Sequence, residues 1–239
     1  MKELPEDVRA AALEHAILAY PRESCGLVIV ERGRLVYVRC KNLSASGDQF
    51  LMAPEDYAAA EDRGELVAVV HSHPDAPANP SQADLVACEA SGLPWWIVGL
   101  PSATWRGCEP TGYRAPLVGR EFHHGVLDCY ALMRDAYREL CGIELPDFHR
   151  DDDWWHRGQN LYLDNFEAAG FVRVPDESLR VHDAVLMKVL SPVPNHAAML
   201  VEDNIILHHL HGRLSSRDVF GGYYRKVVHC TLRHRSLME

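Results

Sequence analysis

Residues 65–84 read Glu-Leu-Val-Ala-Val-Val-His-Ser-His-Pro-Asp-Ala-Pro-Ala-Asn-Pro-Ser-Gln-Ala-Asp, and this stretch decides the fold of the first half of the chain. Its apolar start, Glu65 to Val70, is typical of a buried strand and leads straight into His71. After a proline-rich loop, Ser81 to Asp84 has the pattern of a helix start. A strand, a loop and a helix in succession indicate an α/β unit.

Two histidines and one carboxylate in this stretch have the chemistry of a metal site. His71 and His73 are two positions apart at the end of the strand, so their imidazoles point to the same side. Asp84 can return a carboxylate to them once the loop has turned round. Two imidazoles and a carboxylate are typical of a catalytic zinc, because the fourth tetrahedral position stays open for water. We therefore expect one Zn²⁺ ion, which would activate water and polarise a carbonyl.

Glu23 and Ser81 are candidates for the remaining catalytic roles. Glu23 lies just before a predicted strand and is the candidate general base. Ser81 would offer its hydroxyl to a developing oxyanion. Ser81-Gln82-Ala83-Asp84 also has the form of a capping box, in which Ser81 and Asp84 start the helix with or without metal. Both interpretations remain open for this pair.

Periodicity places further elements around these residues. Pro21 marks the end of the first predicted helix, and Gly64 marks the end of the second. The predicted helices are Pro5 to Ala19, Pro54 to Asp62 and Ser81 to Ala90, and the other strands are Gly26 to Val30, Leu35 to Val38 and Trp95 to Leu100.

The order and spacing of Glu23, His71-Ser72-His73-Pro74, Ser81 and Asp84 resemble the JAMM (Mov34/MPN) metallopeptidase family. The resemblance covers about residues 5 to 108. It implies an α/β fold in α-β-α layers, like that of cytidine deaminases, and cleavage of peptide or isopeptide bonds with one zinc. By this resemblance His71, His73 and Asp84 are the ligands, Glu23 is the acid/base and Ser81 assists the oxyanion.

The stretch from Glu109 to Gly119 mixes prolines and glycines without periodicity and indicates a connector. We therefore predict a domain at 1–108, a linker at 109–119 and a second domain at 120–239. Helices precede strands in the second domain, which indicates an α+β fold. Its predicted helices are Leu127 to Leu140 and Gln159 to Ala169, and its strands are Ala184 to Leu190, Asn195 to Val201, Ile205 to His209 and Tyr223 to Cys230.

Cys129 is a candidate nucleophile because it opens a predicted helix. Unpaired backbone N–H groups and the positive end of the helix dipole favour a thiolate at this position. His196 begins a strand and is the natural partner for a Cys–His pair. A lone cysteine on an apolar helix face is often just a small buried hydrophobe, so the chemistry alone leaves both interpretations open.

A third polar group should hold His196 in one tautomer, and three histidines compete for this role. If Glu202-Asp203-Asn204 is a three-residue loop, His208 lies opposite Ala198 and shares the face of His196. A loop of two or four residues would shift the register by one and select His209 or His211.

The arrangement of Cys129, His196 and a second histidine twelve residues later resembles the NlpC/P60 cysteine peptidases. The resemblance runs from about Arg120 to the C-terminus, implies a papain-like fold and favours His208. The chain departs from the family at Tyr130-Ala131, where Ser-Gly is usual, and at Leu117, where many members that cleave peptidoglycan have tyrosine. A peptidoglycan stem-peptide substrate therefore carries over less directly than the catalytic residues do.

Composition narrows the function classes. The chain has 239 residues, is 47% hydrophobic and 24% charged, and carries a net charge of -10 without a basic patch, which argues against nucleic acid as a partner. The apolar runs Leu66 to Val70 and Ala197 to Val201 are far shorter than the roughly 20 residues that span a bilayer. The seven cysteines show no paired spacing, and the start of the chain lacks the pattern of an export signal. We therefore expect a soluble protein made in a reducing compartment.

A JAMM unit followed by an NlpC/P60 unit resembles the tail-tip assembly proteins of lambda-like phages and prophages. The stretches Gly125 to Tyr130 and Ile206 to Ser215 carry this likeness. It implies a hydrolase with two peptidase sites, made in the bacterial host cytoplasm, with other tail-tip proteins as partners and peptide or peptidoglycan as substrate. It also implies action during tail assembly or at the cell wall, at the virion tail tip. The alternative is a catalytically silent structural adaptor.

Overall fold

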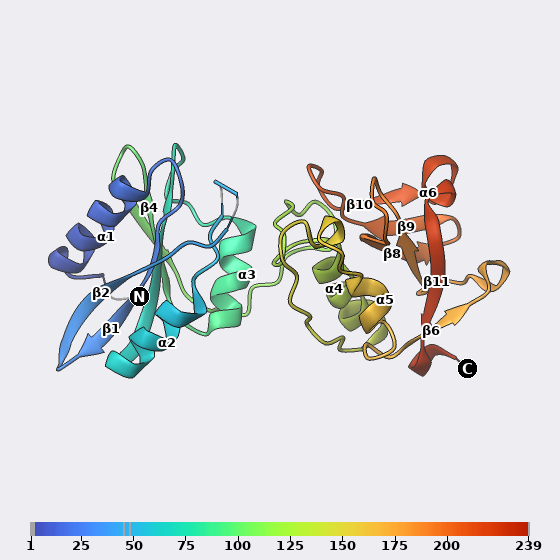
Figure 1. Cartoon of the computed structure of the whole chain (residues 1–239), viewed down its shortest axis with the longest axis horizontal. Coiled ribbons are helices and arrows are strands. Elements are labelled where there is room, and N and C mark those ends of the chain that lie inside the picture. Colours follow the sequence, from blue (N-terminus) through green and yellow to red (C-terminus); the bar gives the residue numbers. More distant parts are fainter. Residues whose placement is uncertain (1–2, 45, 48, 239) are drawn as a thin grey trace. The chain divides into compact units, whose positions relative to one another are not determined.

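The computed structural model describes residues 3–44, 46–47 and 49–238. The chain divides into two units, Met1–Arg114 and Ala115–Glu239, and each unit holds its own β-sheet (Figure 1). The division lies within the predicted connector. Within the described ranges, no helix is long and apolar enough to cross a membrane.

The sheet of the first unit has the strand order β2-β1-β3-β4-β5. Its strands are β1 (Cys25–Glu31), β2 (Arg34–Cys40), β3 (Glu65–His73), β4 (Trp95–Gly99) and β5 (Thr104–Cys108). β3 and β4 are parallel, because α3 (Gln82–Ser91) provides the crossover between them; the other neighbouring strands are antiparallel. Arg32 and Gly33 close the β1–β2 hairpin with φ angles of 50° and 79°, as a two-residue turn with positive φ requires.

Helices cover both faces of this sheet. Alternate side chains of β1 point to opposite faces. On one face, Val28 packs with Val8 and Ala12 of α1 (Glu6–Ala19). On the other, Leu27 packs with residues of α2 (Pro54–Arg63) and of α3. The predicted α-β-α layering is therefore confirmed.

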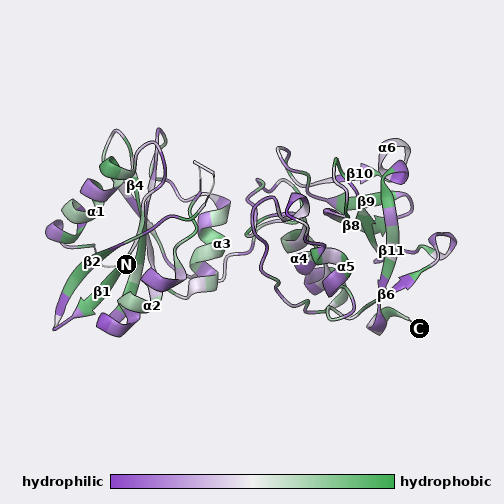
Figure 2. Cartoon of the chain, viewed as in Figure 1, coloured by the Kyte–Doolittle hydropathy of each residue, from purple (hydrophilic) through white to green (hydrophobic). Residues whose placement is uncertain are grey.

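The second unit is built on a six-stranded antiparallel sheet with the order β10-β9-β8-β7-β11-β6. Its strands are β6 (Phe171–Val174), β7 (Ala184–Met187), β8 (His196–Glu202), β9 (Ile205–His208), β10 (Ser216–Val219) and β11 (Val228–His234). The helix α4 (Cys129–Cys141) packs on β8 and β9 through a buried cluster that includes Met133, Tyr137 and Met199. Apolar residues concentrate on the inner strands of both sheets (Figure 2). The α+β prediction is confirmed.

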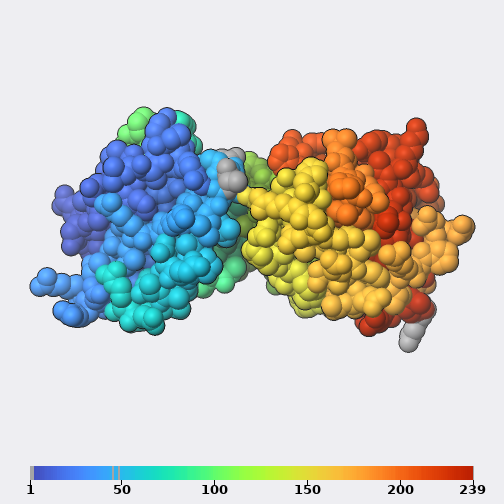
Figure 3. Space-filling view, in the orientation of Figure 1, coloured from blue at the N-terminus to red at the C-terminus, as the bar shows by residue number. Residues whose placement is uncertain are grey.

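Short helical segments complete the second unit: α5 (Leu161–Asn165), α6 (Gly222–Lys226) and the 3-10 turns Trp154–His156, Asp176–Ser178 and Arg235–Leu237. The segment between α4 and the end of α5 supplies much of the visible surface of this unit, in yellow in Figure 3.

Several predicted elements differ from the observed ones. The strand predicted from Tyr223 to Cys230 is wrong in its first half, where α6 forms after Gly221 and only β11 is extended. The helix predicted over Gln159 to Ala169 is reduced to α5, because the chain turns and reaches Gly170 with a φ of 90°. β5, β6 and β10 were not predicted, because all three are short and β5 and β10 have no buried residue, so they show little apolar alternation.

Candidate metal centre and cysteine site

Strand pairing gathers three side chains of the candidate metal centre on one sheet face. Cys25 pairs with His71 in the antiparallel β1–β3 ladder, and the Ser72 N–H donates to the Ser24 carbonyl at 3.1 Å. This register places Glu23 opposite His73. Because side chains alternate along strands, His71, His73 and Glu23 project from the same face.

The three predicted ligands bring their donor atoms together. His71 Nε2 lies 3.1 Å from His73 Nε2 and 3.1 Å from Asp84 Oδ1, and His73 Nε2 lies 3.3 Å from Asp84 Oδ2. Ligands on a tetrahedral zinc with bonds of about 2.0–2.1 Å are about 3.3 Å apart. The donor set and its spacing therefore fit Zn²⁺, and this is the one such cluster among the described residues.

The two imidazoles of this group have different surroundings. His73 Nδ1 lies 3.0 Å from the Pro77 carbonyl and can only donate to it, which leaves the lone pair on Nε2. His71 is fully buried between the rings of Phe50 and Trp95, and burial lowers its pKa. Among the described residues His71 Nδ1 has no hydrogen-bond partner.

Asp84 serves the helix and the candidate metal centre at once. Ser81 is the N-cap of α3: its Oγ accepts the Asp84 N–H at 3.1 Å, and Asp84 Oδ2 accepts the Ser81 N–H at 2.7 Å. The capping box is therefore formed. Oδ1 is left to face His71, so the capping and ligand roles are compatible.

Glu23 is buried, with only 7% of its surface exposed, and it lies near the histidines. Burial lowers the pKa of His73, but the Asp84 carboxylate, the Pro77 carbonyl and the Glu23 charge raise it above its ordinary value overall. The Glu23 backbone is held by Asn42, whose Nδ2 donates to its carbonyl at 3.1 Å. Glu23 is therefore a buried carboxylate within electrostatic range of His73.

In the second unit, Asp128 fixes the start of α4. Its carboxylate accepts the Ala131 N–H at 2.8 Å, the Gly125 N–H at 3.0 Å and the Arg150 Nε–H at 2.8 Å. Side chains of Arg150 and Asp128 are almost fully buried, with 7% and 3% exposed. Cys129 therefore stands on a rigid helix N-terminus.

The Cys129 sulfur lies against the backbone on both sides of His196. Sγ is 3.9 Å from the Asn195 carbonyl oxygen and interacts with the Ala197 N–H, while its closest side-chain partner is the Tyr162 hydroxyl at 3.2 Å. Among the described residues no hydrogen bond joins Sγ to the His196 ring. Such contacts often form only when substrate is bound.

The expectation that helix position favours a Cys129 thiolate is wrong for this structure. Burial and the neighbouring Asp128 charge raise the pKa of Cys129 to about 11, although Tyr162 and the Ala197 amide oppose this. Burial also lowers the pKa of His196 to about 3. With these shifts the thiol of Cys129 and the imidazole of His196 are both neutral near pH 7, because burial disfavours the charged form of each.

The β8–β9 hairpin places His208, and neither His209 nor His211, beside His196. Glu202 pairs with Ile205, so the turn has only two residues, but a bulge between Leu200 and Glu202 restores the pairing of Ala198 with His208. His196 Nε2 lies 3.1 Å from His208 Nδ1. His209 and His211 instead contact the ring of Phe122.

Two residues that sequence reasoning missed adjoin this pair. Asp218 on β10 places Oδ2 3.1 Å from His208 Nε2, and the Tyr224 hydroxyl on α6 donates to the same oxygen at 2.8 Å. Neither β10 nor α6 was predicted, so no sequence signal brought these side chains to His208. The Tyr162 hydroxyl was missed likewise, because it lies on a helix distant in sequence from Cys129.

Two relatives with known names match most of the chain. "Tail tip assembly protein K" of Escherichia phage N15 is 42% identical over 95% of this chain and 94% of its own length. "Tail tip assembly protein K" of Escherichia phage lambda is 47% identical over 77% of this chain and 90% of its own length. The chain belongs to the tail tip assembly protein K family.

In this member of the protein K family, residues 5–108 match the prokaryotic homologs of the JAB domain, and residues 118–233 match the NlpC/P60 family. Both are peptidase families. Among solved structures, a JAB1/MPN domain protein from Archaeoglobus fulgidus is 21% identical over 45% of this chain and 87% of its own, with a TM-score of 0.30.

Proposed function

We propose that this protein is a peptide-bond hydrolase with two separate sites, one zinc-dependent and one cysteine-dependent, that acts in phage tail assembly. The convergence of His71, His73 and Asp84 at tetrahedral spacing is the observation that carries the proposal. The tail role rests on the names of the relatives from phages N15 and lambda.

At the first site, His71, His73 and Asp84 would hold Zn²⁺. A bound zinc ion would supply Lewis acidity and activate water near neutral pH. Glu23 takes a proton from the attacking water and passes it to the leaving amine. Ser81 offers its hydroxyl hydrogen to the oxyanion, because its cap uses Oγ only as an acceptor.

At the second site, neutral His196 takes the thiol proton of Cys129 as the sulfur attacks a substrate carbonyl. The proton then goes to the leaving amine, and water releases the acyl group from sulfur. His208 holds the His196 ring through Nε2. The proposed substrate is a peptide such as the peptidoglycan stem peptide, met at the tail tip after synthesis in the host cytoplasm.

A prediction follows from the raised pKa of the Cys129 thiol. Alkylation of Cys129 by iodoacetamide should accelerate roughly tenfold per pH unit between about pH 7 and pH 9, because the thiolate fraction grows by that factor below a pKa of about 11. Mass spectrometry of the peptide that contains Cys129 measures the rate, and Cys141 in the same samples serves as the internal reference. A rate independent of pH over this range would indicate a thiolate–imidazolium pair and contradict the assignment.

Genetic complementation of a phage that lacks the protein distinguishes a catalytic role from a structural adaptor role. A double variant, Glu23→Gln with Cys129→Ala, should fail to restore infectious particles to a phage that lacks the protein, because both proposed chemical steps are lost. Immunoblots should show the double variant at wild-type abundance. The control pair is Glu65→Gln with Cys141→Ala, which changes the same residue types outside both sites. Full complementation by the double variant would support the adaptor.

A further inference from the structure

Asp218 ends a line of polar groups that leads inward through His208 to His196. Its Oδ2 lies 3.1 Å from His208 Nε2, and His208 Nδ1 lies 3.1 Å from His196 Nε2. His208 and His196 are buried, whereas the Asp218 side chain is 23% exposed. The line therefore runs from the surface of the second unit to the interior.

The donor and acceptor properties of these groups determine which ring nitrogens of His208 and His196 carry the protons. A carboxylate can only accept a hydrogen bond. The contact between Asp218 Oδ2 and His208 Nε2 is within ion-pair distance, although its angle departs from that of a hydrogen bond. Nε2 of His208 is buried, and Asp218 supplies the facing acceptor, so the His208 proton belongs on Nε2. Nδ1 of His208 is then an acceptor, and the His196 proton must lie on Nε2 to donate to it.

This proton order leaves a lone pair on Nδ1 of His196. The described residues place no hydrogen bond on that nitrogen, and in the proposed mechanism it is the atom that takes the thiol proton. With the order reversed, Nδ1 of His196 would carry the proton and could not act as a base. We infer that Asp218 is a positioning residue of the cysteine site, which holds His208 and His196 in the tautomers that make His196 a base. The inference rests on the proposed cysteine peptidase function.

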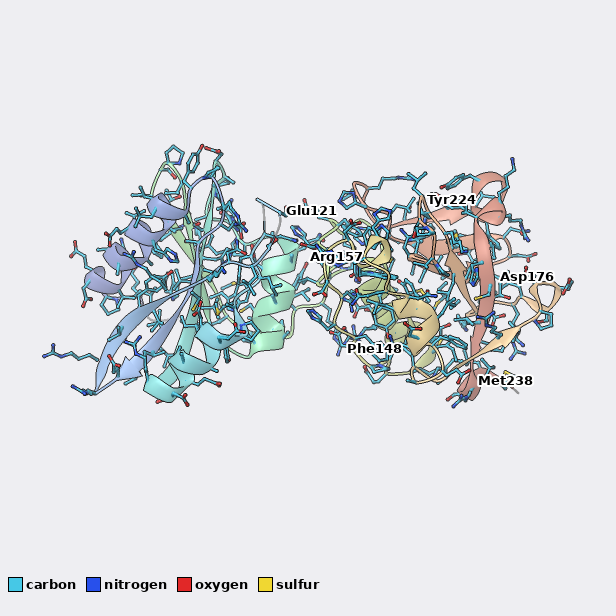
Figure 4. All side chains as sticks on the ribbon, in the orientation of Figure 1. Glu121, Phe148, Arg157, Asp176, Tyr224 and Met238 are labelled. Carbon is cyan, nitrogen blue, oxygen red and sulfur yellow. The ribbon has the colours of Figure 1, made fainter. Side chains whose placement is uncertain are left out.

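The groups around Asp218 support this role. Tyr224 from α6 donates its hydroxyl to Oδ2 at 2.8 Å and packs its ring edge-on against His208, with centroids 4.9 Å apart. Tyr224 lies at the α6 end of the second unit (Figure 4). Arg213 is the nearby cation, 3.6 Å from Oδ2 and with 54% of its side chain exposed, and the Ser216 hydroxyl also bonds to Asp218. The buried partner of Asp218 is thus His208, and its contact with Arg213 is peripheral.

The test is Asp218→Asn, which keeps the size but removes the charge and can turn an amide N–H toward His208. In wild type, ¹H–¹⁵N spectra of the imidazoles should show His196 and His208 each protonated on Nε2 alone. In Asp218→Asn the two His208 nitrogens should move toward averaged shifts. Signals are assigned from His196→Gln and His208→Gln.

Hydrolysis gives the second readout. Loss of a partner behind a metal-binding histidine costs about 10–100-fold. By analogy, kcat of Asp218→Asn on a cleaved peptide should fall by about this factor while KM stays unchanged. Asp218→Glu, which restores the carboxylate, should recover part of the rate. Tyr224→Phe removes one hydrogen bond to Asp218, and the kcat of this variant should lie between those of wild type and Asp218→Asn.

Arg217→Ala is the matched control, because Arg217 lies next to Asp218 on β10 but pairs with Glu202. Wild-type His208 protonated on Nδ1, or Asp218→Asn indistinguishable from Arg217→Ala in the imidazole spectra, would overturn the inference. If wild type cleaves no peptide, the peptidase proposal fails while the spectra still decide the role of Asp218.

Discussion

His71→Ala is expected to remove zinc from the protein. Wild type should carry about one Zn²⁺ ion per chain, and the variant close to none, because the change deletes one of three ligands. The loss of affinity should exceed the 10–100-fold that follows removal of a partner behind a ligand. Elemental analysis after dialysis measures this. His149→Ala, which alters an exposed histidine of the other unit, should keep its zinc.

Thermal unfolding checks the same site without activity. Zinc at about 100 times its dissociation constant should stabilise the wild-type first unit by about 2.7 kcal/mol, a shift of roughly 10 °C in its Tm. His71→Ala should show no shift. Since His71 is fully buried and the variant can misfold, His73→Ala, whose side chain is 13% exposed, serves as the second variant. Wild type that binds no zinc would refute the metallopeptidase part of the proposal.

Cys129→Ala is expected to abolish hydrolysis of a peptidoglycan stem peptide. Removing a catalytic nucleophile costs as much as 10⁶-fold in other enzymes, so we expect a loss of at least about 10³-fold in kcat. Chromatography of the cleaved peptide measures the rate. Cys141→Ala changes a cysteine at the other end of α4 and should retain wild-type activity. Equal cleavage by wild type and Cys129→Ala would remove the cysteine site from the proposal.

The three side chains that converge at the candidate metal centre could be predicted because much of their placement is local. The alternation of β3 places His71 and His73 on one side, and the capping box of α3 fixes Asp84 at its first turn. Glu23 is the exception, because its position depends on the register of β1 against β3. For Glu23 the prediction rested on the family pattern and not on local geometry.

The cysteine site could be predicted only in part. The helix start at Asp128 and the strand start at His196 were visible in the sequence, but the extent of burial that raises the pKa of Cys129 was not. The hairpin argument left three histidines open, and the family resemblance favoured His208, in agreement with a three-residue loop. In the structure a two-residue turn and a bulge produce the same pairing. A bulge has no clear signature in a single strand, because it depends on how two strands fit together.

By itself, the sequence predicted an α/β first unit, an α+β second unit and the side chains that could do chemistry, because periodicity and helix caps act over a few residues. The α-β-α layers and the families of the two units came from the resemblance. Only the tertiary structure decided the histidine beside His196, the neutral state of Cys129, and the contacts of Tyr162 and Asp218. These depend on strand register and burial, which arise between segments far apart in the chain. The residues that supply the chemistry can thus be predicted from local sequence, whereas their protonation states depend on tertiary packing.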